Sequence, residues 1–122
     1  MNSTIDKQIR NCLVAIDMVK SLPPEKFTKG LSSWTCGSAA CFGGWVAVHP
    51  FFKKQGVVRV SEDGSPTFIG SLYGAASEVS RSLFGSYVLF DYRAWGELPG
   101  LSDKQVVLYR LKRALNALLD AS

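Results

Sequence analysis

The middle of the chain contains a stretch of mostly small residues enclosed by two tryptophans. It reads Trp34-Thr35-Cys36-Gly37-Ser38-Ala39-Ala40-Cys41-Phe42-Gly43-Gly44-Trp45. Small side chains let two backbones approach closely, and the flanking rings supply bulk on which neighbouring elements pack. We therefore expect a short buried helix over residues 38–48, with Ser33 or Thr35 near its N-cap and His49-Pro50 ending it. The residues to which we assign a structural role in this motif are Trp34, Cys36, Gly37, Cys41, Gly44 and Trp45.

The composition is that of a globular chain. Its 122 residues are 47% apolar and 20% charged, which suits a single domain over residues 1–122 with a real core. No apolar run approaches the roughly 20 residues of a membrane span, and the polar residues 1–7 do not resemble a signal peptide. An odd count of three cysteines predicts reduced thiols, so we expect a cytoplasmic protein with no membrane partner.

Apolar residues spaced three and four apart predict helices on both sides of the motif, over residues 4–20, 71–84 and 102–118. The first stripe consists of Ile5, Ile9, Cys12, Ile16 and Val19. Two β-prone runs, 57–60 and 66–69, enclose Asp63-Gly64 and predict a β-hairpin. The expected fold is α+β: a mainly helical domain with about three principal helices, the central one short and buried, and one β-hairpin at the side.

The motif also resembles a known group of proteins. The pattern Trp-x-Cys-Gly-Ser-x-Ala-Cys-x-x-Gly-Trp over residues 34–45, followed by Leu83-Phe84, Trp95 and a Ser-capped last helix, is similar to small uncharacterised proteins of bacteriophages and prophages. The resemblance implies a phage-type protein that acts in the cytoplasm of a host bacterium. It implies no activity that can be transferred residue by residue, and the predicted hairpin over 57–69 is not part of the pattern.

A cysteine-dependent enzyme is one alternative function. A thiol at Cys36, just before a helix N-terminus, would have its thiolate stabilised by the helix dipole, and His49 is the only histidine available as a base. If residues 38–48 form one helix, however, its two ends lie about 16 Å apart at ~1.5 Å per residue. Cys36 and His49 would then be too far apart to cooperate, so we predict no catalytic residues.

A metal site is also not expected. Cys36, Cys41 and His49 have the spacing C-x4-C-x7-H, which matches no usual zinc pattern and lacks an evident fourth ligand. Gly43 and Gly44 belong to neither a phosphate-binding loop nor a dinucleotide fingerprint. We therefore predict neither a metal nor a cofactor.

Nucleic-acid binding is the second alternative. The formal net charge is +4, and aromatic rings can stack on bases while basic side chains meet phosphates. The residues that would do so are Tyr87, Tyr92, Arg93 and Trp95 for stacking, and Lys53, Lys54 and Arg59 for phosphates.

Protein binding is the function that we favour. Interfaces are enriched in aromatic residues and arginine, and the segment 87–95, which includes Tyr87, Phe90, Tyr92, Arg93 and Trp95, has that composition. A hairpin edge at 57–69 would offer a strand for pairing. We therefore predict a small non-enzymatic accessory protein that binds and modulates, by inhibition, a host bacterial protein.

Overall fold

The computed structural model describes residues 3–22, 34–35, 39–40, 42–59, 66–68, 76–86, 89 and 103–122. Two long helices, α1 (Ser3–Ser21) and α5 (Asp103–Ala121), account for much of this part of the chain. Three shorter helices are α2 (Phe42–Val48), α3 (Pro50–Lys53) and α4 (Ala76–Phe84). The strands form two pairs, β1 (Trp34–Thr35) with β2 (Ala39–Ala40), and β3 (Val57–Arg59) with β4 (Pro66–Phe68).

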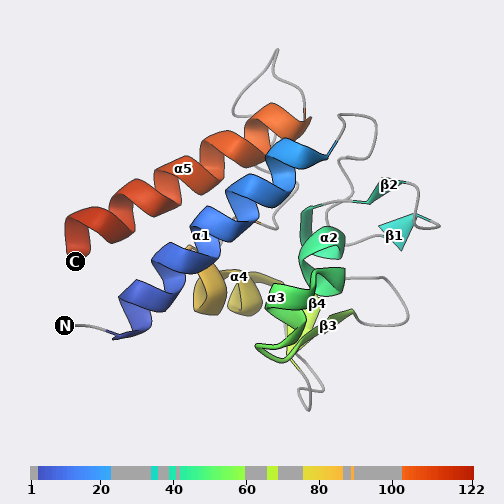
Figure 1. Cartoon of the computed structure of the whole chain (residues 1–122), viewed down its shortest axis with the longest axis horizontal. Coiled ribbons are helices and arrows are strands. Elements are labelled where there is room, and N and C mark those ends of the chain that lie inside the picture. Colours follow the sequence, from blue (N-terminus) through green and yellow to red (C-terminus); the bar gives the residue numbers. More distant parts are fainter. Residues whose placement is uncertain are drawn as a thin grey trace.

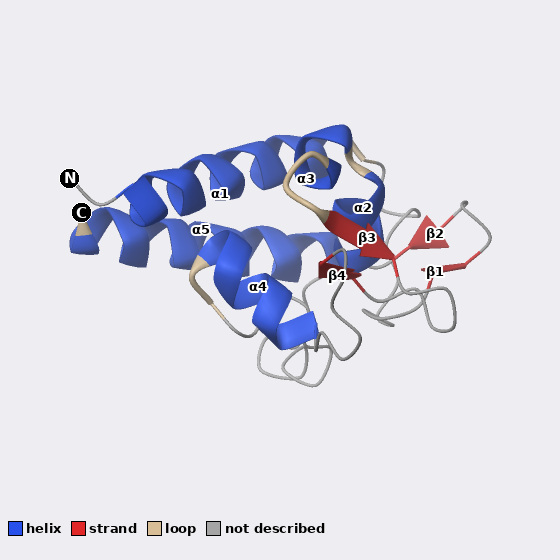
Figure 2. Ribbon diagram, turned by 90° about the horizontal axis from the view of Figure 1, so that it is seen from below, coloured by secondary structure: helices blue, strands red, loops and turns tan. Residues whose placement is uncertain are grey.

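Helices α1 and α5 lie side by side and antiparallel, so the start of α1 lies close to the end of α5 (Figures 1 and 2). At one end of the pair, Lys104 Nζ donates to the carbonyl oxygens of Lys20 and Leu22 at 3.1 and 2.6 Å. At the other end, Leu118 and Gln8 meet around Gly85, since both lie within 4 Å of the position of a Cβ on that glycine. These two contacts define the register of the helix pair.

Helix α1 is buried on more than its predicted stripe. Cys12, Ile16 and Val19 are buried as the spacing indicated, but Asn11 and Met18 are buried too. The reason is that α1 contacts α5 along one side and α4 along another, where Gln8 Nε2 donates to the carbonyl oxygens of Arg81 and Ser82. A helix packed on two sides needs a wider apolar face than the stripe of a surface helix.

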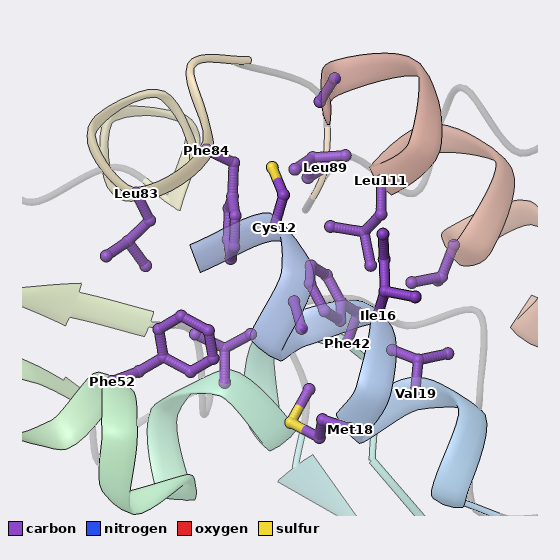
Figure 3. Close-up of a cluster of buried hydrophobic side chains, with 14 of the residues drawn as sticks. Cys12, Ile16, Met18, Val19, Phe42, Phe52, Leu83, Phe84, Leu89 and Leu111 are labelled. Carbon is purple, nitrogen blue, oxygen red and sulfur yellow. The ribbon is translucent and has the colours of Figure 1, made fainter. Parts of the chain in front are cut away.

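Three phenylalanines from three helices form the centre of the core (Figure 3). The ring centroids of Phe42 and Phe84 are 5.8 Å apart, and those of Phe52 and Phe84 are 5.7 Å apart. All three side chains are fully buried, and burying each stabilises the fold by about 1.5–3 kcal/mol. The cluster joins α2, α3 and α4 beneath α1.

The central helix predicted over 38–48 is wrong in its first part. Trp34 pairs with Ala40 and Thr35 with Ala39 in an antiparallel ladder, and α2 begins only at Phe42. Thr35 is therefore a strand residue and not an N-cap. Helix propensity does not explain this start, because Gly43 and Gly44 lie inside α2 and alanine, which precedes it, is the best helix former. Pairing with Trp34 and Thr35 holds Ala39 and Ala40 in a strand. The predicted end is correct, because α2 stops at Val48.

The α+β class with a β-hairpin is also wrong. The described residues form five helices and are mainly helical. β3 and β4 do pair, with Val57 opposite Phe68 and Arg59 opposite Pro66. Val57 of β3 is buried in the core, but a single pair of three-residue strands is too small to form a β layer. A further difference is α3, which begins at Pro50 where we expected a helix to end.

None of the described helices is both long enough and apolar enough to cross a membrane.

Candidate functional site

A cleft of about 300 Å³ lies between the last turn of α1 and the junction of α2 with α3. Its walls are mostly apolar, with one hydroxyl and one imidazole. The lining residues are Met18, Ser21, Leu22, Trp45, Val48, His49 and Pro50. A concave, mainly apolar surface with a few polar groups is the usual form of a binding site.

Two segments build the walls. Trp45 and Val48 lie three residues apart on α2 and so project from one face of it, while Met18 lies in the last turn of α1 and Leu22 directly follows that helix. Between α2 and α3 the chain turns at His49, whose backbone is extended with φ −75° and ψ 129°. Pro50 then starts α3, at a position where its missing N–H costs nothing.

The imidazole of His49 is held in place by a capping role. Its Nδ1 accepts a hydrogen bond from the backbone N–H of Phe51 at 3.2 Å, and its ring centroid lies 5.6 Å from that of Phe52. A neutral imidazole that accepts at Nδ1 carries its proton on Nε2. His49 therefore serves as the N-cap of α3 and as a fixed wall of the cleft.

The cleft combines a buried floor with an accessible wall. Met18 is almost completely buried, whereas Trp45 and Leu22 are half-buried and Val48 is 37% exposed. Val48 is one of four large apolar residues in the described part of the chain that are exposed to solvent; the others are Leu13, Tyr109 and Leu119. At Val48, therefore, the apolar wall of the cleft is accessible to solvent.

Charged residues of both signs lie next to the lining residues in the sequence. Asp17 and Lys20 are exposed in the last turns of α1, and Lys53 and Lys54 are exposed at the end of α3. None of the described residues that line the cleft is acidic. At the end of α1 the carbonyl oxygens of Lys20 and Leu22 accept from Lys104, so the negative end of that helix is met by a cation. The mostly apolar lining favours an apolar ligand.

The structure places only part of the predicted residues. Of the structural motif, Trp34 lies in β1, Gly44 lies in α2 and Trp45 lines the cleft, while Cys36, Gly37 and Cys41 lie outside the described residues. Of the predicted binding residues, Lys53 and Lys54 are exposed next to α3, and Arg59 is the last residue of β3. The others lie outside the described residues: Tyr87, Phe90, Tyr92, Arg93 and Trp95.

The described residues offer little for thiol or metal chemistry. Burial raises the pKa of the Cys12 thiol to about 12, so this thiol is not ionised near neutral pH. No group of three or more His, Cys, Asp or Glu residues close enough to hold a metal is found in the part of the chain that the structure describes. The distance argument between Cys36 and His49 no longer applies, because residues 38–48 are not one helix.

Sequence reasoning did not find most of the cleft. Trp45 and His49 were noted for other reasons, but Met18, Leu22, Val48 and Pro50 were not proposed as binding residues. A signal did exist, because Met18 is an apolar residue outside the main stripe of α1 and Leu22 directly follows the helix. Apolar residues outside the stripe of a helix indicate a second packing partner or an accessible apolar surface.

Comparison with known proteins yields no relative: neither the protein-family models nor the curated proteins nor the solved structures include a match to this chain.

Proposed function

We propose that this chain is a small non-enzymatic binding protein whose cleft receives an apolar side chain of a partner protein. The resemblance of residues 34–45 to phage proteins supports a bacterial host protein as the partner, with modulation of that protein as the outcome.

The single observation that carries this proposal is the exposed apolar cleft itself. Met18 and Trp45 from two different helices shape a cavity of about 300 Å³, which is at the lower end of the range of ligand pockets and is large enough for one bulky side chain. Methionine and tryptophan surfaces adapt to apolar anchors and are frequent in protein interfaces. Such an anchor, buried in a pocket, typically supplies most of the affinity of an interface.

The lining of the cleft favours a protein over a nucleic acid. Stacking of bases needs an accessible aromatic face next to a continuous basic groove. Here the ring of Trp45 is half-buried among aliphatic side chains, and none of the described lining residues is a lysine or an arginine. A pocket of this kind suits an apolar side chain of a protein.

The test is affinity capture from bacterial lysate with tagged wild-type protein and two variants, in the presence of nuclease. Val48→Glu places a carboxylate on the exposed wall of the cleft. Ala117→Glu is the matched control, because Ala117 is an exposed aliphatic residue on α5, outside the cleft. We expect a stoichiometric host protein that wild type and Ala117→Glu retain and that Val48→Glu loses.

The captured protein is then purified and titrated calorimetrically against the same variants. A loss of about tenfold or more in affinity for Val48→Glu, which corresponds to about 1.4 kcal/mol, supports the cleft as the site. Equal retention by Val48→Glu contradicts it. Capture that nuclease abolishes would favour the nucleic-acid alternative, and turnover of a captured small molecule would favour the enzyme alternative.

A further inference from the structure

The cleft contains two polar side chains whose remaining hydrogen-bonding capacity is fixed by the bonds that they already make. Ser21 is the last residue of α1, and His49 lies between α2 and α3; both line the cleft. Each is bonded to a backbone group that can act in one role only, as a donor or as an acceptor. The role that each side chain has left for a ligand follows from this.

The imidazole of His49 can donate to a ligand. Its Nδ1 lies 3.2 Å from the backbone nitrogen of Phe51, and because a backbone N–H can only donate, Nδ1 is the acceptor. The proton of the neutral ring is then on Nε2. In the part of the chain that the structure describes, Nε2 has no hydrogen-bond partner, and it is not closed off from solvent. The Nε2–H group is therefore accessible.

The hydroxyl of Ser21 can accept from a ligand. Its Oγ lies 2.8 Å from the carbonyl oxygen of Met18, one turn earlier in α1. A carbonyl oxygen can only accept, so the hydroxyl proton is used in this bond and the lone pairs of Oγ remain. Ser21 is exposed. Of the other described lining side chains, Trp45 can only donate, and the thioether of Met18 is a weak acceptor.

A ligand that matches this lining has a bulky apolar body and one polar group that both accepts and donates. A leucine or phenylalanine side chain would leave the Nε2–H group of His49 without a partner, which lowers affinity. Tryptophan can only donate, and an ionised carboxylate can only accept. Among large apolar side chains, tyrosine alone has a hydroxyl, which accepts and donates at the end of its ring.

The volume of the cleft is sufficient for a phenol ring. An apolar cavity of ~150 Å³ binds benzene, and the cleft measures about 300 Å³. Met18 and Trp45 supply a sulfur atom and an aromatic ring, both of which make favourable contacts with a second ring. Space remains for the hydroxyl group and for a bridging water.

We propose that the side chain that binds in this cleft is a tyrosine of the partner protein. The inference rests on the proposed function, because it names the side chain that the same cleft receives. The phenol oxygen accepts a hydrogen bond from His49 Nε2, and the phenol proton is donated to Ser21 Oγ, directly or through one water. His49 and Ser21 thereby favour tyrosine over phenylalanine, which has nearly the same shape.

NMR titration of the isotope-labelled full chain with two blocked amino acids tests the inference. N-acetyl-tyrosinamide and N-acetyl-phenylalaninamide differ by the hydroxyl alone, and the backbone amide signals of Trp45 and Val48 report binding in the cleft. Ligands of this size bind with Kd values on the order of 1 mM, so titration to about 20 mM approaches saturation. At about pH 8, where free imidazole is neutral, we expect the tyrosine amide to bind about fivefold or more tightly than the phenylalanine amide.

Two variants separate the hydrogen bonds from packing. Ser21→Ala removes the acceptor, and His49→Asn removes the Nε2 donor while it keeps an acceptor at the N-cap of α3. Each should bring the Kd values of the two amides several-fold closer together, and the double variant should bind both amides about equally. Ser82→Ala is the matched control at an exposed serine of α4 outside the cleft, and it should keep the wild-type ratio. The ratio is insensitive to small changes in cleft shape, because both amides have the same ring.

Three results would overturn the inference. Equal affinity of wild type for the two amides excludes selection of tyrosine but leaves the proposed function intact, since the cleft still binds a ring. A preference for the tyrosine amide that neither Ser21→Ala nor His49→Asn reduces shows that these side chains do not make the selection. If neither amide shifts the signals of the cleft up to about 20 mM, both the inference and the cleft as a binding site are wrong.

Discussion

The side-chain amides of Asn11 and Gln55 donate hydrogen bonds to each other, from Asn11 Nδ2 to Gln55 Oε1 at 3.2 Å and from Gln55 Nε2 to Asn11 Oδ1 at 2.9 Å. Asn11 is fully buried, and its Nδ2 also donates to the carbonyl oxygen of Leu83 at 2.9 Å. One amide therefore joins α1, the turn after α3 and the end of α4. Residues 44 positions apart in the sequence satisfy each other's polar atoms inside the core.

These hydrogen bonds predict that truncation of Asn11 lowers stability more than truncation of Gln55. Asn11→Ala should lower the free energy of unfolding by about 2–3 kcal/mol, because it leaves the Leu83 carbonyl and the Gln55 amide without their partner. Gln55→Ala should cost about 1 kcal/mol, because Gln55 is only half-buried and water can reach the vacated site. Urea unfolding measures both. A double-mutant cycle with no coupling energy would show that the two amides do not interact.

Gly85 and Gly56 form a matched pair of left-handed glycines. Their φ angles are +75° and +91°, so alanine is strained at both positions, by about 1 kcal/mol. At Gly85, however, an added Cβ would lie 2.9 Å from Leu118 Cδ2, whereas at Gly56 nothing lies within 4 Å. We expect Gly85→Ala to be the more destabilising by about 1–3 kcal/mol, because overpacking is added to strain. Equal melting temperatures of the two variants would contradict the close approach of α5 to Gly85.

Cys12 makes stability depend on alkaline pH. Burial raises its pKa from 9.0 to about 12, so the folded protein keeps the thiol protonated where the unfolded chain ionises. The stabilisation is complete below pH 9 and is lost as the pH rises toward 12, at up to about 1.4 kcal/mol per pH unit. Urea unfolding between pH 8 and 10.5 measures this slope. Cys12→Ala is the control, because lysines and tyrosines also titrate there, and its slope should be shallower than that of wild type.

The cap at His49 can be tested by exchange of the acceptor. His49→Ala removes the acceptor of the Phe51 N–H and the ring contact with Phe52, and should cost about 1–2 kcal/mol of stability. His49→Asn keeps an acceptor at the N-cap and should restore about half of that loss. Thermal melts of the three proteins compare them. If His49→Asn is no better than His49→Ala, ring packing rather than capping is the role of His49.

Lys104 on α5 contacts the C-terminal end of α1, which is distant from it in the sequence. Its Nζ donates to the carbonyl oxygens of Lys20 and Leu22, a cation at the negative end of a helix dipole. Lys104→Met keeps the aliphatic part of the side chain and removes the charge, and should destabilise the fold by about 1 kcal/mol. The effect should shrink in high salt. Hydrogen exchange of the last turn of α1 should accelerate in the variant, and unchanged protection there would contradict the contact.

The sequence alone determined the helices whose pattern is local. Apolar residues three and four apart from Ile5 to Val19 predicted α1, and leucines with the same spacing from Leu108 predicted α5. The spacing of apolar residues along a surface helix is enough to identify its buried face. The predicted end of the helix over 71–84 is confirmed, since α4 ends at Phe84 and the backbone N–H of Gly85 donates to the carbonyl oxygen of Arg81. Local rules of propensity and capping suffice for such elements.

Tertiary structure decided what those local rules leave open. The first part of the central motif pairs as β1–β2 instead of joining α2, and Pro50 begins a helix where a local reading ends one. The burial of Asn11 and the cleft at Trp45 depend on which elements α1 meets along its second edge. Contacts between residues distant in sequence determine these features. The periodicity of one segment shows which of its faces is apolar, but it does not show which other element packs against that face.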